Sequence, residues 1–235
     1  MAIDCIELLK KVFRKLKHEE PRDAFYFEDT GYLNFIIFKN GYSTLGNVLI
    51  YKKENRFIID GIHSAVRPYK KSFKQVYKPN KTTSFIVYRK PYERFISLYK
   101  DIMPNDVNHQ VVLEKYGLSR SEIKQNPLSF LKILEFQGIH DAHVMSQTEC
   151  IERGNLSFSM IDLIVPIEQL SEFISKELHV SLEQVPLTNA SKNIDASMFE
   201  PYREKIEAYF KKDLSIPLQY GHKFYKRKDL ESSLE

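Results

Sequence analysis

The sequence has few residues of some types and lacks long apolar runs, and several of these shortages exclude a class of protein. Tryptophan is absent, and the two cysteines, Cys5 and Cys150, have neither the spacing of a metal site nor the number needed for a disulfide framework. This cysteine usage is typical of a reducing compartment. No apolar run approaches the roughly 18 residues of a membrane span, and no signal-peptide pattern is found. We therefore expect a cytoplasmic protein that needs no metal.

Charge of one sign is not in large excess either. The 235 residues carry 35 basic and 31 acidic side chains, for a net charge of +4, and 43% of them are hydrophobic. This balance suits an anionic ligand but is far from that of a dedicated nucleic-acid binder. The length fits a single domain over residues 1–235, with a sizeable core and a polar tail at 229–235.

Residues 33–51 are the first stretch that indicates a binding site. The apolar run from Leu33 to Phe38 predicts a buried strand, and apolar residues at helical spacing resume at Leu45. A lysine–asparagine–glycine turn at 39–41 separates the two. Backbone N–H groups and the positive end of the helix dipole would favour an anion at such a turn. The alternative is a plain turn with a solvated lysine.

A second strand-to-helix junction carries further basic residues. Thr82–Tyr88 is rich in β-branched and aromatic residues, which predicts a strand. Pro91 suits the first turn of the following helix, which we expect from Tyr92 to about Asp101. The carboxyl ends of parallel strands share one edge of a sheet, so the two junctions predict a ligand with two separated charged groups.

The rest of the chain alternates strands with helices. We expect a turn-rich connector at 18–31, and strands at Arg56–Asp60 and Met160–Val165. Helices are expected at Ser119–Gln125, Pro127–Phe136, Ile167–Leu178 and Met198–Asp213. This order predicts an α/β fold with a largely parallel central sheet flanked by helices.

Two basic segments allow two interpretations each. Residues 3–17 form a basic amphipathic pattern within an expected N-terminal helix at 1–20; it packs on its own domain or makes peripheral contact with an anionic membrane. Gly61–Lys81 interleaves lysines and arginines with aromatic residues. It is either a solvated face or one wall of a cleft for an acidic substrate.

The two junctions together resemble the carbohydrate sulfotransferases, in particular sulfotransferase family 2. FKNGYST at 38–44 looks like their 5′-phosphosulfate loop, and RKPYERFISLY at 89–99 looks like their 3′-phosphate motif, R-x-P-x-x-R-x-x-S-x-Y, at every fixed position. Similar echoes lie at Asp141–Cys150, Glu168–Leu170, Pro186–Ser191 and Tyr209–Asp213. Two departures are Phe38, where the family usually has proline, and Tyr42, where a small residue is usual.

The resemblance implies a P-loop-like sulfotransferase architecture and a donor, 3′-phosphoadenosine 5′-phosphosulfate (PAPS), which leaves as PAP. Arg89 and Ser97 would hold its 3′-phosphate, and Arg94 would either join them or brace the helix by an ion pair. Lys39 would also stabilise the leaving oxygen. The residues implied to hold the 5′-phosphosulfate are Lys39, Asn40, Gly41, Tyr42, Ser43 and Thr44.

Sulfuryl transfer also needs a base for the proton of the acceptor hydroxyl, and histidine is the natural choice. His63 follows the expected strand at Arg56–Asp60 and is our first candidate, because some family members keep a catalytic histidine at a similar place. His143 is the second. Other residues considered are His109, His140, Glu93 and Asp60.

The sequence thus predicts a PAPS-dependent sulfotransferase that acts on a hydroxyl of a saccharide or glycolipid. One alternative is a P-loop-type nucleotide phosphotransferase, although the loop at 39–44 is no Walker A sequence and paired carboxylates for Mg²⁺ are missing after the strands. The other alternative is a membrane-peripheral binding protein without catalysis.

Overall fold

The computed structural model describes residues 23–59, 61–103, 113–135, 141–181, 183 and 194–225. Several expected features lie outside these residues: the helix at 1–20, the turn at Pro186–Ser191, the tail at 229–235, and Asp60, His109 and His140. Within the described ranges, no helix is long and apolar enough to cross a membrane.

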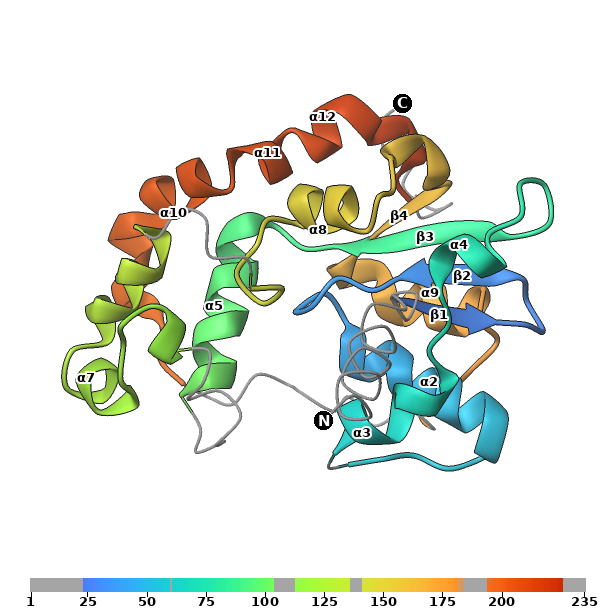
Figure 1. The fold of residues 1–235 in the computed structure, drawn as a ribbon, viewed down its shortest axis with the longest axis horizontal. Helices are drawn as coiled ribbons and strands as arrows, with labels where there is room; N and C mark the ends of the chain where they lie inside the picture. The colour runs from blue at the N-terminus through green and yellow to red at the C-terminus, as the bar shows by residue number, and fades with distance from the viewer. Residues whose placement is uncertain are drawn as a thin grey trace, which may run out of the picture.

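A four-stranded sheet forms the centre of the protein (Figure 1). Its strands, in spatial and chain order, are β1 (Ala24–Phe27), β2 (Tyr32–Phe35), β3 (Thr83–Tyr88) and β4 (Leu163–Pro166). The β1–β2 pair is antiparallel, whereas β2–β3 and β3–β4 are parallel. The expected α/β fold with a largely parallel sheet is therefore confirmed.

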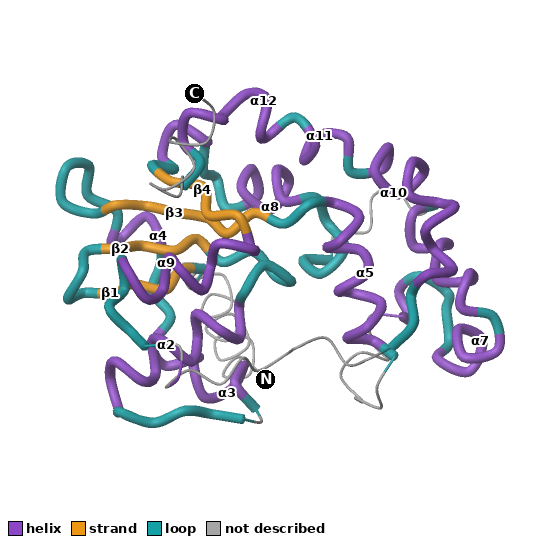
Figure 2. The backbone as a smooth tube through the Cα atoms, turned by 180° about the vertical axis from the view of Figure 1, so that it is seen from behind, coloured by secondary structure: helices purple, strands orange, loops and turns teal. Residues whose placement is uncertain are grey.

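Helices cover both faces of this sheet, as the views from front and back show (Figures 1 and 2). The helices are α2 (Tyr42–Glu54), α3 (Ile62–Val66), α4 (Phe73–Val76), α5 (Pro91–Ile102), α7 (Arg120–Gln125), α8 (Gln147–Arg153), α9 (Leu170–Lys176), α10 (Arg203–Tyr209), α11 (Lys211–Leu214) and α12 (Ile216–Tyr220). The 3₁₀ segments are η1 (Arg67–Tyr69), η2 (Pro127–Leu134), η3 (Phe158–Met160), η4 (Ile167–Gln169), η6 (Ser197–Tyr202) and η7 (Gly221–Lys223).

The alternation of side chains along β3 divides the core between these faces. Phe85 and Val87 pack with residues of α2, α3 and α9. Ile86 and Tyr88 point to the opposite face and pack with residues of α4, α8 and α12. Full burial of each such apolar side chain contributes about 1.5–3 kcal/mol of transfer free energy. The apolar sequence of β3 therefore belongs to a strand that is covered on both sides.

A third cluster of apolar side chains lies beyond the end of β3, where α5, α7, η2 and α10 pack together. Phe95 and Tyr99 of α5 contact Phe130 of η2 and Phe199 of η6, with ring centroids 4.8–5.4 Å apart. This cluster fixes one side of α5. The other side of the helix is left to carry the polar residues of the second motif.

Two expectations about strands were wrong. The expected connector at 18–31 contains β1, because four residues are too few to show a period above the charged flanks. No strand forms at 56–59 of the expected Arg56–Asp60; instead the N–H and C=O of Ile58 bond to the side chain of Asn47 on α2, at 2.9 and 3.0 Å. An amide side chain thus satisfies the groups that a neighbouring strand would have bonded.

Three helices and two strands also differ from their expected form. The expected helix at Met198–Asp213 is divided into η6, α10 and α11, and Pro201 lies inside η6, where it cannot donate a backbone hydrogen bond. Pro127–Phe136 is the 3₁₀ segment η2, and Ile167–Leu178 begins as η4 before α9. The strands expected at Leu33–Phe38 and Met160–Val165 are β2 and β4, shifted by a few residues.

Candidate active site

The first motif is a tight turn between β2 and α2. Lys39 and Gly41 both have positive φ angles, 69° and 78°. A side chain at 41 has no room, because a Cβ there would lie 2.5 Å from Cδ2 of Leu170. Positive φ is costly for a lysine, and such strain concentrates at functional sites.

The turn leads into the N-terminus of α2, which no side chain caps. Gly41 is the N-cap and has no side chain to accept the first N–H groups, and the first turn contains no acidic residue. The positive end of the helix dipole is therefore not offset by the helix itself. Ser43 is buried and Thr44 is half-buried in this first turn.

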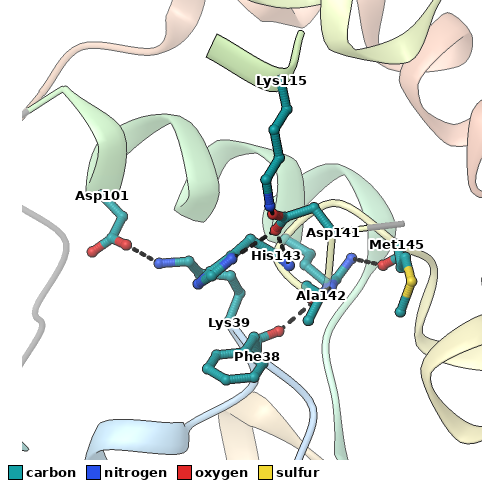
Figure 3. A network of polar contacts seen from close by, with 9 residues as sticks. Phe38, Lys39, Asp101, Lys115, Asp141, Ala142, His143 and Met145 are labelled. Atoms are coloured by element: carbon teal, nitrogen blue, oxygen red, sulfur yellow. Dashed lines mark hydrogen bonds and ion pairs between the residues drawn. The ribbon is translucent and has the colours of Figure 1, made fainter. Parts of the chain in front are cut away.

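Lys39 forms an ion pair with Asp101, which lies in the last turn of α5 (Figure 3). Burial lowers the pKa of Lys39, although the charge of Asp101 counteracts this shift; the positive charges of Arg94 and Arg89 add to the lowering. The lysine of the first motif thus contacts a carboxylate of α5, the helix that carries the second motif.

The second motif lines a cavity of about 270 Å³. Arg89 and Ser97 both face it, so β3 and α5 bring these two residues together, as the motif requires. Burial lowers the pKa of Arg89. The cavity is lined by Arg89, Tyr92, Glu93, Ile96, Ser97, Lys100, Ile167 and Arg203. Three basic residues in one cavity of this composition favour an anionic ligand.

Arg94 is not among the residues that line this cavity. Its side chain is only 2% exposed, and its guanidinium donates to the carbonyls of Met145 at 2.7 Å, and of Phe38 and Ala142 at 3.4 Å (acceptors labelled in Figure 3). Arg94 thus braces α5 against the first loop and the segment before α8 through carbonyls, and among the described residues it forms no ion pair of the kind that was one of its two predicted roles. Its role in holding a 3′-phosphate stays a prediction.

A buried amide joins the two motifs. Gln147, fully buried at the start of α8, accepts a hydrogen bond from the main-chain N–H of Arg89 at 3.0 Å and donates to its carbonyl at 2.9 Å. The amide of Asn40 donates to Gln147 and, at 2.6 Å, to the carbonyl of Val87. Asp213 accepts from the main chain of Gln147 and Thr148 at 2.8 and 2.9 Å. The 141–150 and 209–213 echoes are therefore parts of one scaffold beneath both loops.

His63 on α3 is stacked on Tyr42, with ring centroids 4.5 Å apart. The ammonium of Lys70 lies over two neighbouring rings, 4.7 Å from the centroid of Tyr42 and 6.0 Å from that of Phe38. Partial burial lowers the pKa of His63, and the charges of Lys70 and Lys39 lower it further. A histidine in this setting is neutral at pH 7 and can accept a proton.

His143 also packs against Phe38, whose ring centroid is 4.9 Å from that of His143 and 6.2 Å from that of His63. Nδ1 of His143 is 2.8 Å from a carboxylate oxygen of Asp141, and Lys115 donates to the second oxygen at 2.7 Å (Figure 3). Burial would raise the pKa of Asp141, but the hydrogen bonds from His143 and Lys115 outweigh it and hold that pKa well below its usual value. An ionised Asp141 fixes the orientation of the His143 ring.

Sequence reasoning missed three residues here. Asp101 could have been found from its spacing, because it lies four residues after Ser97 and therefore on the same face of α5. Lys100 and Arg203 line the cavity, but nothing in their local sequence marks them. Tyr42, which departs from the family pattern, is buried against Phe25, with ring centroids 5.4 Å apart, so its side chain belongs to the core. In the described part of the chain, no three His, Cys, Asp or Glu side chains are grouped to hold a metal ion.

Comparison with known proteins gives the family. A sequence model of the sulfotransferase family matches residues 22–228, a span that contains both loops, the scaffold of Gln147 and both histidines. No curated protein matches the chain in the same comparisons, and no solved structure does. The α/β sheet flanked by helices agrees with the P-loop-like architecture that the resemblance implied. Since the match extends over most of its length, the chain belongs to the sulfotransferase family.

Proposed function

We propose that this protein transfers a sulfuryl group from PAPS to a hydroxyl of a saccharide or glycolipid. The observation that carries the proposal is the pairing of two anion-binding elements at one edge of the sheet, both fastened to Gln147. One is the uncapped N-terminus of α2 with Lys39; the other is the cavity with Arg89 and Ser97. A donor with a phosphosulfate and a separate phosphate matches this charge distribution.

The residues present fit such a donor. The first loop offers main-chain N–H groups, because the N-cap of α2 is a glycine and no side chain caps the helix. The glycine is required there, because a Cβ would clash with Leu170. The cavity offers the guanidinium of Arg89, the hydroxyl of Ser97 and the ammonium of Lys100, which are suited to a phosphate. Membership of the sulfotransferase family independently points to PAPS as the donor.

The chemistry then assigns two roles to side chains of this chain. Bound PAPS supplies an activated sulfuryl group, so the acceptor hydroxyl has to lose a proton and negative charge grows on the leaving phosphate oxygen. Lys39 stabilises that charge, as a cation held in a half-buried site. His63 takes the proton, because its neutral form predominates at pH 7; His143 is the second candidate. A general base of this kind contributes about 10²–10⁴-fold in rate.

A thermal-shift experiment tests the donor. PAP without Mg²⁺ should raise the melting temperature, whereas ATP with Mg²⁺ should not. Stabilisation by ATP–Mg²⁺ alone would replace the proposal by nucleotide phosphotransfer, and liposome binding without any nucleotide effect would favour the membrane-peripheral alternative. A transfer screen with ³⁵S-labelled PAPS over glycans and glycolipids identifies the acceptor. A cytoplasmic location and membrane contact through 3–17 stay predictions from the sequence.

A further inference from the structure

The ion pair of Lys39 and Asp101 connects two elements that are 62 positions apart in the chain. Lys39 lies in the strained turn before α2, and its side chain is 12% exposed. Asp101 lies in the last turn of α5 and is 33% exposed. A half-buried lysine of a phosphosulfate loop is therefore already engaged with an anion that belongs to the protein (Figure 3).

The charges around this pair make Asp101 a competitor for an anionic ligand. Asp101 is the acidic residue that counteracts the lowered pKa of Lys39, while Arg94 and Arg89 act in the opposite direction. The same two charges act on the pKa of His63, which Lys39 lowers and Asp101 raises. An anion that enters the loop must either share the Lys39 ammonium with Asp101 or take it over. Two anions on one ammonium repel each other strongly in a half-buried site.

We propose that Asp101 is the resting partner of Lys39, and that binding of the donor exchanges this ion pair for one between Lys39 and the donor. In the absence of donor, Asp101 positions the lysine side chain across the loop and offsets the cost of burying its charge. On donor binding, that contact is given up. Asp101 is thus a positioning residue that lowers the affinity of the site. The proposal rests on the proposed function, because the exchanged anion is the phosphosulfate end of PAPS.

The opposite interpretation makes a different prediction. If Asp101 only supported the shape of the loop, its removal would leave Lys39 badly placed and would weaken binding. If Asp101 acted only through long-range repulsion, its removal would tighten binding whether or not Lys39 was present. Exchange requires that the gain depends on Lys39.

A double-mutant cycle separates these cases. Dissociation constants for PAP would be measured by calorimetry for the wild type, Asp101→Asn, Lys39→Met and the double variant. Asparagine keeps the size of the side chain and can still accept a hydrogen bond from Lys39, but it removes the charge. We expect Asp101→Asn to bind PAP about tenfold more tightly than the wild type, and we expect no gain when the same change is made in Lys39→Met.

The chain offers a matched control in the ion pair of Lys52 and Asp29, where the Asp29 side chain is 57% exposed. Asp29→Asn should leave the affinity for PAP unchanged. Weaker binding by Asp101→Asn, or an equal gain in both backgrounds, would overturn the exchange. A wild type that binds no PAP would instead count against the proposed function.

A second readout needs no donor. Since Asp101 counteracts the lowered pKa of Lys39, its removal lowers that pKa further and increases the fraction of the side chain present as free amine at pH 8. Acetylation of Lys39 by acetic anhydride at pH 8, followed by peptide mass spectrometry, should be several-fold faster in Asp101→Asn than in the wild type or Asp29→Asn. An unchanged rate would show that Asp101 does not hold the lysine, whatever the donor is.

Discussion

Gln147 holds the main chain of Arg89 from both sides, accepting from its N–H at 3.0 Å and donating to its carbonyl at 2.9 Å. This two-point contact is the one that a neighbouring strand would make, here supplied by a side chain at the point where β3 ends. The same amide receives Asn40 of the first loop. Gln147 therefore joins the two loops directly, beside the contacts of Asn40 with Val87, of Arg94 with Phe38 and of Lys39 with Asp101.

Replacement of this amide should cost both stability and affinity. Gln147→Leu keeps a similar volume but leaves the N–H and C=O of the half-buried Arg89 without these partners. We expect the free energy of unfolding to fall by about 2–4 kcal/mol, measured by urea denaturation, and binding of PAP to weaken. Gln125→Leu, an exposed change at the end of α7, is the control and should alter neither. A Gln147→Leu protein with wild-type stability would show that the amide does not join the loops.

Gly41 allows a test with a well-matched control. Gly41→Ala suffers both from its φ of 78° and from a Cβ 2.5 Å from Leu170, whereas a Cβ added at Gly117, with φ of 60°, would meet nothing within 4 Å. We expect a loss of about 1–2 kcal/mol for Gly117→Ala from the backbone alone and about 2–4 kcal/mol for Gly41→Ala, since overpacking adds to it. Thermal unfolding measures both. Equal losses would mean that Leu170 yields to the new side chain without cost.

His63 should be required for turnover but not for donor binding. His63→Ala should lose at least about 100-fold in kcat, while calorimetry should find PAP binding little changed. Exposed His222→Ala is the control and should keep full activity. Near-normal turnover by His63→Ala together with its loss in His143→Ala would move the role of base to His143.

The pH dependence follows from the environment of the same residue. Partial burial, and then the charges of Lys70 and Lys39, lower the pKa of His63 below its ordinary value of 6.5. The neutral form is the base, so kcat/KM, which reports the pKa of the free enzyme, should be highest above this pKa and should fall as the pH drops through it, on the acidic side of 6.5. A pH–rate profile with the limb above neutrality would exclude His63 in this role.

Arg89 should recognise one phosphate of the donor and not the other. Arg89→Met should weaken binding of PAP by about 100-fold, as expected for a lost charge-assisted contact, but it should leave the affinity for adenosine 5′-phosphosulfate, which has no 3′-phosphate, nearly unchanged. Calorimetry with both ligands makes the comparison. Its exposed neighbour offers the control Lys90→Met, expected to affect neither ligand. Equal losses for the two ligands would place Arg89 elsewhere in the site.

Local sequence was sufficient for the elements that carry the motifs. β3 and α5 formed within one or two residues of their expected bounds, because β-branched residues, a proline at the first helical turn and a periodic apolar face act over short distances. The sequence also identified the family through two motifs. The strand predicted at Arg56–Asp60 does not form, because the side chain of Asn47 on α2 makes the hydrogen bonds of Ile58. No local sequence pattern indicates such a contact.

The sequence by itself determined the α/β class and the two strand-to-helix junctions with the basic and hydroxyl side chains that they contain. Only the tertiary structure decided which of those side chains face the cavity and that the guanidinium of Arg94 donates to main-chain carbonyls. It also decided that His63 and His143 both pack against Phe38 and that Lys39 forms an ion pair with Asp101. The physical reason is that hydrogen bonds and ion pairs depend on ångström-scale distances. Those distances are set by how distant helices pack on the sheet, whereas motif spacing constrains only neighbours along the chain.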